Sequence, residues 1–316
     1  MRTVIEAWLN ELDNGRACEL VTVLAVEGTA PREPGCTMVI GSDGRILAGT
    51  VGGGSVEYEA VKKAALLLKE GQSGEAVFEH GSGIKNEADF YGAKVTLRFT
   101  YCGETMRTSL SALREALLAD SGKLVVHPSG KIEFFAGSMP EETVKDGALC
   151  LYLPPKSRVL LFGAGHVAQA LCPLLKTVGF SVTVCDERKE LACRERFPQA
   201  DRVLAAPFSE DIAELTGAGA EDFIVIMSAT HRTDELILSR FTDREYRYIG
   251  MLGSWRKAAA ITGSLIEKGV PEARLKEVHV PIGLPIGART PEEIALSVAA
   301  ELVKVRSGAK PVADDR

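Results

Sequence analysis

The order of apolar and polar positions differs between the two halves of the chain. In the first half, apolar runs at 18–28 and 36–53 predict antiparallel strands with a hairpin turn at 42–44. Residues 55–71 then place apolar side chains at helical spacing. Further helix and strand signals follow at 76–78, 94–101, 110–119 and 122–135. Residues 1–153 therefore predict an N-terminal α+β domain.

Apolar and amphipathic segments alternate regularly after Pro154 and Pro155, which favour an extended connector. The expected strands lie at 202–204, 223–227, 247–251 and 277–280, and the expected helices at 189–197, 209–216, 234–241 and 254–268. The final helix should start at Thr290 as N-cap, with Pro291 next and Glu293 closing a capping box. The predicted fold class is therefore α/β, with residues 156–316 forming a Rossmann-like, doubly wound parallel sheet domain and its C-terminal helix.

The segment 157–186 has the pattern of a nucleotide-binding strand, turn, helix and strand. Gly163 and Gly165 allow a tight turn, and a helix starting near His166 would present free N–H groups to a phosphate. Asp186, 21 positions after Gly165, ends the second strand, where an acid can accept the hydroxyls of a ribose. The segment predicts a Rossmann turn, and it leaves open whether the crevice holds a dinucleotide, another ligand or nothing.

Composition narrows the class of partner. The chain has 316 residues and a net charge of −6, which argues against nucleic acid as a partner. The sequence has no run of about 18 apolar residues and no leader with a basic start and an apolar core. We therefore expect a cytoplasmic location and no membrane partner. The seven cysteines include no CxxC pair, which is typical of reduced packing residues.

A triple-glycine loop in the first half is a candidate anion site. Gly52, Gly53 and Gly54 precede Ser55 and Glu57 at the start of an expected helix. Glycines let a backbone approach a ligand closely, and a helix start offers N–H groups. The competing interpretation is that Ser55 is an ordinary N-cap.

Other candidate binding residues lie in turns. Arg32 sits in a stiff Pro and Gly turn that could hold its guanidinium against a phosphate, or it is an exposed surface arginine. His231 and Arg232 follow one expected strand, and Gly253 and Ser254 follow the next, where open α/β sheets bind ligands. Helix capping by neighbouring polar residues would account for His231's segment equally well.

Two basic residues, Arg256 and Lys257, fall in the first turn of the expected helix at 254–268. Positive charge is unfavourable there unless an anion is close, so these residues mildly favour a ligand. The sequence lacks an HExxH motif, a GxSxG elbow and the lysine loop of NTPases, so neither a catalytic residue nor a protein-bound metal is expected.

Six segments, in this order, resemble the xanthine dehydrogenase accessory protein family (XdhC/CoxI-like): TAPREPG, VGGGSVE, FGAGHVAQAL, ATHRTDELIL, YIGMLGSWRK and VHVPIGLPIGARTPEEIALSVAAEL. The resemblance spans nearly the whole chain. It implies a carrier of the molybdenum cofactor (molybdopterin) that protects the cofactor during sulfuration and helps insert it into xanthine dehydrogenase or a related molybdenum hydroxylase. It also implies a homodimer and a cysteine desulfurase as a further partner.

Two positions depart from the family pattern. Ser55 and Tyr91 stand where the family commonly has cysteines. Serine and tyrosine are poor ligands for soft metal and sulfur chemistry. We therefore expect a cofactor to be held by glycine-loop N–H groups and by basic residues such as Arg32, without a thiol.

Two other functions remain open at this stage. The first is an NAD(P)-dependent oxidoreductase that uses Gly163, Gly165 and Asp186, with His231 as an acid. The second is a non-catalytic regulator that has lost carrier activity, motivated by Ser55 and Tyr91.

Overall fold

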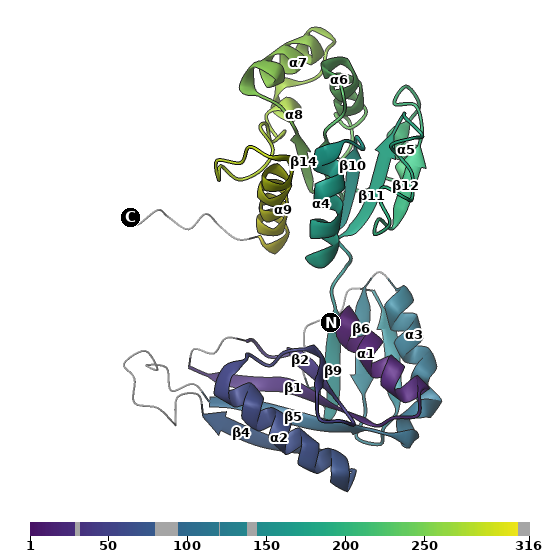
Figure 1. Ribbon diagram of the computed structural model, residues 1–316, viewed down its shortest axis with the longest axis vertical. Helices are drawn as coiled ribbons and strands as arrows, with labels where there is room; N and C mark the ends of the chain where they lie inside the picture. Colours follow the sequence, from purple (N-terminus) through teal and green to yellow (C-terminus); the bar gives the residue numbers. More distant parts are fainter. Residues whose placement is uncertain (29–31, 80–93, 120, 138–143, 309–316) are drawn as a thin grey trace. The chain divides into compact units, whose positions relative to one another are not determined.

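The computed structural model describes residues 1–28, 32–79, 94–119, 121–137 and 144–308. The chain divides into two compact units, Met1–Pro155 and Lys156–Arg316 (Figure 1). Each unit has its own buried apolar clusters. Each also holds one of the two tryptophans: Trp8 is fully buried in the first unit, and Trp255 is 74% exposed in the second.

The first unit contains two antiparallel sheets. Among the described residues, one sheet has the order β3-β2-β1-β5-β4 and the other the order β7-β6-β9-β8. Their strands are β1 Cys18–Glu27, β2 Thr37–Gly41, β3 Ile46–Gly49, β4 Gly74–Glu79, β5 Lys94–Cys102, β6 Gly122–Val126, β7 Ile132–Ala136, β8 Val144–Lys145 and β9 Ala148–Leu153. The pairing of β2 with β3 confirms the predicted hairpin turn at 42–44.

Helices cover these sheets because their apolar side chains recur at helical spacing. The helical elements are α1 Arg2–Asp13, α2 Gly54–Glu70, the 3-10 helix η1 Glu104–Ser109 and α3 Leu110–Leu118. Helix α2 buries Val56 and Ala60 against one face of the β3-β2-β1-β5-β4 sheet. Leu20, on the other face of β1, shares a core with α1, α3 and the second sheet. Successive strand residues thus supply two different cores.

The second unit is built on a parallel sheet with the order β12-β11-β10-β13-β14. Its strands are β10 Arg158–Phe162, β11 Ser181–Asp186, β12 Arg202–Ala205, β13 Phe223–Ile226 and β14 Tyr248–Met251. From β10 the chain first adds β11 and β12 on one side of the sheet and then β13 and β14 on the other side, so that the order of strands changes direction between β10 and β13, as in the Rossmann fold. The predicted fold class, an α+β domain followed by a Rossmann-like domain, is confirmed.

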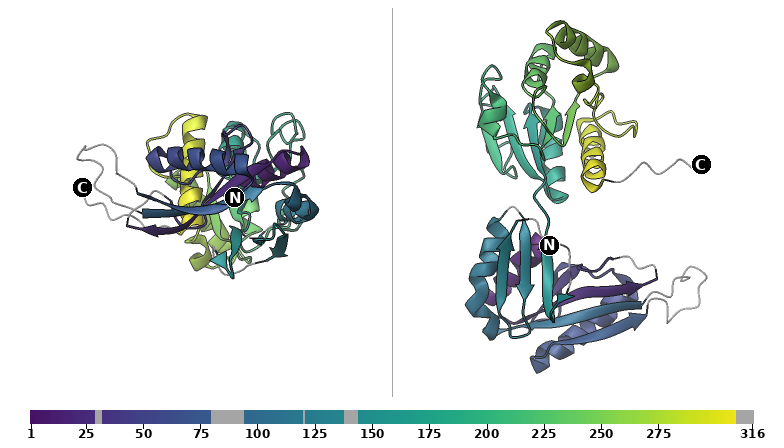
Figure 2. Two further views of the ribbon diagram at one scale, coloured as in Figure 1. Left: turned by 90° about the horizontal axis from the view of Figure 1, so that it is seen from below. Right: turned by 180° about the vertical axis from the view of Figure 1, so that it is seen from behind.

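Helices lie on both faces of the parallel sheet (Figures 1 and 2). They are α4 His166–Thr177, α5 Ile212–Thr216, α6 His231–Ser239, α7 Trp255–Glu267, α8 Glu272–Leu275 and α9 Pro291–Ser307. Helices α4 and α9 share one core, while α5, α6 and α7 share the core on the opposite face. Helix α9 begins as predicted, because Thr290 and Glu293 form a capping box.

Two predicted elements of this unit are wrong. Residues 189–197 form separate turns instead of a helix, because burial of Phe197 and of the nearby Ala200 outweighs the local helical pattern. Residues 277–280 do not form a full strand; His279 makes a single parallel bridge with Gly250. Pro281 follows directly and has no N–H group with which to extend the ladder.

Candidate functional site

The carboxyl ends of β10, β13 and β14 carry the loops in which sequence analysis placed most candidate residues. Gly163 directly follows β10 and has φ +113°, and a Cβ atom there would lie 2.3 Å from the carbonyl oxygen of Met227. The N–H of Met227 donates to the carbonyl of Phe162 at 2.8 Å. Glycine at 163 is therefore required because two loops of the protein lie against each other.

Gly165 and His166 differ from Gly163. Gly165 has φ −78° and is the N-cap of α4, with no side chain capping the helix. A Cβ atom at Gly165 would meet no atom of the described residues within 4 Å. His166 follows, exposed, as the first residue of α4. This open helix start is compatible with a phosphate group.

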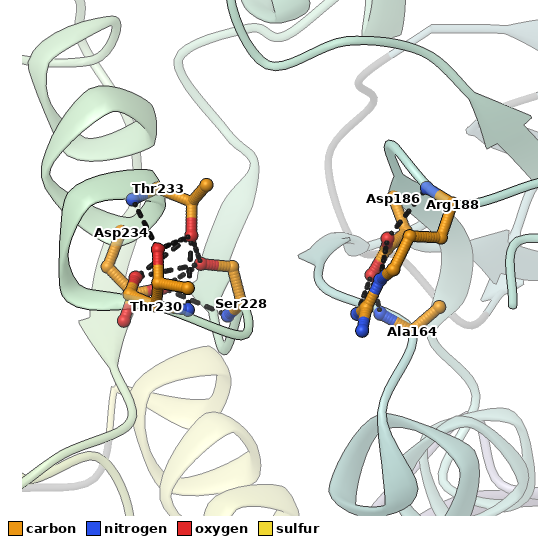
Figure 3. Close-up of polar contacts among 7 residues, drawn as sticks. All are labelled: Ala164, Asp186, Arg188, Ser228, Thr230, Thr233 and Asp234. Atoms are coloured by element: carbon orange, nitrogen blue, oxygen red, sulfur yellow. Dashed lines mark hydrogen bonds and ion pairs between the residues drawn. The ribbon is translucent and has the colours of Figure 1, made fainter.

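Asp186 is engaged within the protein (Figure 3). Its carboxylate accepts the N–H of Ala164 at 2.8 Å, and the N–H, Nε and Nη2 of Arg188 at 2.9, 2.8 and 2.8 Å. Burial raises the pKa of Asp186, but the hydrogen bonds from Arg188 and Ala164 outweigh it, so that the pKa lies below its ordinary value. A ribose could reach this carboxylate after Arg188 had been displaced.

The loop after β13 is organised as a helix cap. Thr230 caps α6, and Thr233 completes a capping box with it. The predicted alternative, a helix cap formed by neighbouring polar residues, is therefore confirmed. His231 and Arg232 are exposed in the first turn of α6. They are available to a ligand, while the cap itself is structural.

Asp234 is fully buried and lies in the polar cluster with Ser228 (Figure 3). Its carboxylate accepts the N–H of Ser228 at 2.9 Å and forms an ion pair with Lys257 Nζ. Lys257 Nζ also donates to the carbonyl of Leu252 at 2.8 Å. The basic first turn of α7 predicted a nearby anion. For Lys257, that anion is the internal carboxylate of Asp234.

Gly253 and Ser254 serve the same arrangement. A Cβ atom at Gly253 would lie 2.5 Å from Cδ of Lys257. The hydroxyl of Ser254 accepts the N–H of Lys257 at 3.3 Å as the N-cap of α7. Both residues therefore have structural roles in placing Lys257, and their role in binding a ligand stays a prediction. Arg256 is exposed.

The triple-glycine loop of the first unit holds its own carboxylate. Glu57 Oε2 accepts the hydroxyl of Thr50 at 2.5 Å and the N–H groups of Val51 and Gly53 at 3.2 and 3.3 Å. The N–H of Gly52 donates to Thr50 Oγ1 at 3.1 Å. Of the glycine-loop N–H groups that were expected to face an anionic ligand, that of Gly53 is bound by Glu57 and that of Gly52 by Thr50.

Ser55 is not the N-cap of α2, so that interpretation is wrong. Gly53 occupies the cap position with φ 75°, Gly54 begins the helix with φ 61°, and Ser55 is exposed in the first turn. Positive φ values explain why glycine stands at these positions. Tyr91 lies outside the described residues.

A pocket of about 400 Å³ brings Arg32 close to the segment that leads into the glycine loop. It is lined by the turn at 32–37, the start of α1, Gly49 with Thr50, and two residues of β9, Cys150 and Tyr152. Sequence analysis missed the thiols of this pocket. Cys36 stands four positions after Arg32 in the same turn, and this proximity was the available signal.

Two negative findings limit the chemistry of the described residues. Within them, no cluster of three or more His, Cys, Asp or Glu side chains could hold a metal ion. In the same part of the chain, every helix is too short or too polar to cross a membrane.

Two family models match the chain. The model described as "XdhC and CoxI family" matches residues 11–80, and the one described as "XdhC Rossmann domain" matches residues 159–302. In both halves of the chain, the match includes the glycine turn described above.

Three curated relatives are similar along nearly all of the chain. "Uncharacterized protein YqeB" of Escherichia coli is 29% identical over 92% of the chain, which spans 44% of that protein's length. A protein of Bacillus subtilis described as a probable subunit of xanthine dehydrogenase is 27% identical over 96% of the chain and 97% of its own length. "Molybdenum cofactor insertion chaperone PaoD" of Escherichia coli is 24% identical over 96% of the chain and 88% of its own length.

A crystal structure described as a xanthine dehydrogenase from Bacillus halodurans superposes with a TM-score of 0.79. It covers 99% of the chain and 98% of its own length at 23% identity. At this level of identity the likeness shows a shared fold.

Proposed function

Since the chain belongs to the XdhC and CoxI family, we propose that it binds the molybdenum cofactor and delivers it to a molybdenum hydroxylase such as xanthine dehydrogenase. The observation that carries the proposal is the similarity to a molybdenum cofactor insertion chaperone over 96% of the chain and 88% of the relative. In this function the cofactor is cargo, and the protein needs groups that hold it and let it go.

Three features of the described residues support a phosphate-bearing cargo. The start of α4 has no capping side chain, and the space at Gly165 is open. His231 and Arg232 place exposed basic or titratable side chains in the first turn of α6. Arg32 lines a pocket in the first unit. Helix starts and guanidinium groups are the usual protein partners of phosphates.

The alternative of an NAD(P)-linked oxidoreductase has no support among the curated relatives. Asp186, which such an enzyme would use for the ribose, is closed by Arg188 and by the N–H of Ala164. The regulator alternative rests on Ser55 and Tyr91 and gains no further observation. Sulfuration with a cysteine desulfurase, a homodimer and a cytoplasmic location stay parts of the proposal.

The experiment is a binding measurement with molybdenum cofactor released from a purified molybdenum enzyme, under anaerobic conditions. We expect the parent protein to bind the cofactor, and Gly165→Val to bind at least tenfold more weakly while melting cooperatively. Gly263→Val is the matched control, because a Cβ atom at Gly263 in α7 also meets no protein atom within 4 Å.

The two outcomes that count against the proposal differ. Absence of cofactor binding by the parent protein would overturn the proposed function. Equal affinity of parent and Gly165→Val would leave the function standing and remove the Rossmann turn from the site. Mass spectrometry of any small molecule that copurifies gives an independent identification of the cargo.

A further inference from the structure

The pocket around Arg32 combines a cation with two thiols. Its volume is about 400 Å³, and Arg32, Cys36 and Cys150 all line it. Cys36 is half-buried in the turn before β2, and Cys150 is 4% exposed in β9. Arg32 is exposed. A guanidinium and a thiol that share one cavity can bind two different parts of one ligand.

The walls of the pocket are fixed by backbone contacts. Gly49 has φ +79°, and a Cβ atom there would lie 2.1 Å from the carbonyl oxygen of Thr37. Thr37 Oγ1 donates to the carbonyl of Gly35 at 3.1 Å and lies 3.0 Å from the hydroxyl of Thr22. These close contacts hold the turn that carries Cys36 against β1 and β3. The cavity is therefore built into the fold of the first unit.

The pocket is also coupled to the glycine loop. Thr50 lines the pocket, and its hydroxyl donates to Glu57, which organises the loop at the start of α2. Ser55 does not line the pocket. A thiol that serves this side of the protein is thus supplied by Cys36 and not from position 55. Glu33 and Met1 also line the pocket, and the terminal ammonium group of Met1 interacts electrostatically with Cys36. Arg32 is therefore one of two cationic groups beside a carboxylate, and its guanidinium is the one that can act as a directed, two-pronged hydrogen-bond donor.

We propose that this pocket binds a small ligand that carries an anionic group and a soft, thiol-binding centre. The guanidinium of Arg32 pairs with the anionic group, and Sγ of Cys36 contacts the soft centre. A molybdenum cofactor, with its phosphate and its sulfur-bound metal, has both parts; that identity of the ligand rests on the proposed function. The chemistry of the pocket is tested without the cofactor.

The test compares the rates at which iodoacetate and iodoacetamide alkylate Cys36. In both reactions the thiolate displaces iodide and a thioether forms, but iodoacetate alone carries a negative charge. Cys193 is the internal control, since Cys36 and Cys193 are the two half-buried thiols of the described chain. Peptide mass spectrometry of the full-length protein gives the iodoacetate-to-iodoacetamide rate ratio at each position.

We expect this ratio to be at least tenfold higher at Cys36 than at Cys193. Arg32→Gln should abolish the difference. Arg45→Gln should preserve it, because Arg45 has a side chain that is 84% exposed on the β2–β3 turn and does not line the pocket. Equal ratios at the two cysteines, a ratio unchanged by Arg32→Gln, or a Cys36 that neither reagent modifies would each overturn the proposal.

A second experiment, which measures binding of the cofactor, distinguishes this inference from the proposed function. Cys36→Ser should bind the molybdenum-containing cofactor at least tenfold more weakly, with less loss for the metal-free pterin. An unchanged affinity would remove the thiol contact. If the parent binds no cofactor while Cys36 keeps its charge-selective alkylation, the proposed function fails and the pocket for an anionic, thiol-binding ligand stands.

Discussion

The carboxylate of Asp234 forms a buried ion pair with the ammonium group of Lys257. The pair joins the first turn of α6, which follows β13, to the first turn of α7, which follows β14. The N–H of Ser228 and the carbonyl of Leu252 complete the surroundings of the two charges. The starts of two neighbouring helices at the carboxyl edge of the parallel sheet are therefore joined by a contact of opposite charges.

Removing one partner of this pair should be costly. Asp234→Ala leaves Lys257 largely buried, with a side chain 13% exposed and no carboxylate, so we expect the free energy of unfolding to fall by about 3–5 kcal/mol. Lys268→Ala, which breaks a pair whose lysine side chain is 65% exposed, is the control and should cost less than about 1 kcal/mol. Urea denaturation measures both. Similar losses in the two variants would show that the buried pair is no more important than an exposed one.

Glu19 should make stability depend on pH. It is fully buried in β1, neither carboxylate oxygen has a hydrogen-bond partner among the described residues, and burial raises its pKa from 4.5 to about 8. The folded state therefore keeps a proton that the unfolded state has lost between these two values. Glu19 accordingly removes stability as pH rises through this window, by about 1.4 kcal/mol per pH unit at most.

Glu19→Gln tests that dependence because glutamine has the same shape and no titration. The free energy of unfolding of the variant, followed from pH 5 to pH 9 (roughly one pH unit beyond the upper pKa), should vary less than that of the parent, and the variant should be the more stable protein at the alkaline end. Parallel curves for the two proteins would mean that Glu19 is not protonated in the folded state.

Gly163 and Gly165 should respond differently to the same substitution. Alanine at 163 would need a backbone with φ +113° and would place Cβ 2.3 Å from the Met227 carbonyl, so we expect a loss of about 2–4 kcal/mol. Alanine at 165 meets open space at an ordinary φ, and should cost under about 1 kcal/mol. Thermal melts of the two variants provide the comparison. The reverse ranking would contradict the loop contact.

Replacing Asp186 should lower the stability of the protein itself, whether or not a nucleotide binds. Asp186→Ala removes the acceptor for the Ala164 N–H and for Arg188, and we expect a loss of about 1–3 kcal/mol in the free energy of unfolding. Because its pKa is lowered, Asp186 stabilises the parent above the ordinary pKa of an aspartate, and this stabilisation is lost as pH falls through the folded value. An unchanged stability together with a changed NAD(H) affinity would restore the ribose-binding role.

The parts of the fold that were predictable depend on local signals. The α9 capping box needs Thr290 and Glu293, which are three positions apart, and the Rossmann turn needs glycines within one short segment. Apolar spacing was sufficient to place α2 and the strands of the parallel sheet. The wrong helix at 189–197 had a helical pattern, but its segment gained more from burying Phe197.

The candidate site was less predictable because its contacts join distant positions. Lys257 and Asp234 are 23 residues apart, and Cys36 and Cys150 are 114 residues apart. No local pattern shows that a basic helix start has an internal acid, or that two cysteines meet in one cavity. Glu57 was also not predictable in this respect: its position near the glycines was visible in the sequence, but not that its carboxylate turns back to bind the N–H groups of Val51 and Gly53.

The distribution of the two tryptophans gives each unit its own optical reporter. Trp8 is enclosed in the core shared by α1, α3 and both antiparallel sheets, so its emission should be blue-shifted and should move to the red when the first unit unfolds. Trp255 is already in water at the start of α7, and its emission should respond chiefly to quenchers and to anything that covers the edge of the parallel sheet. A single fluorescence experiment can thus follow loss of structure in one unit and occupancy in the other.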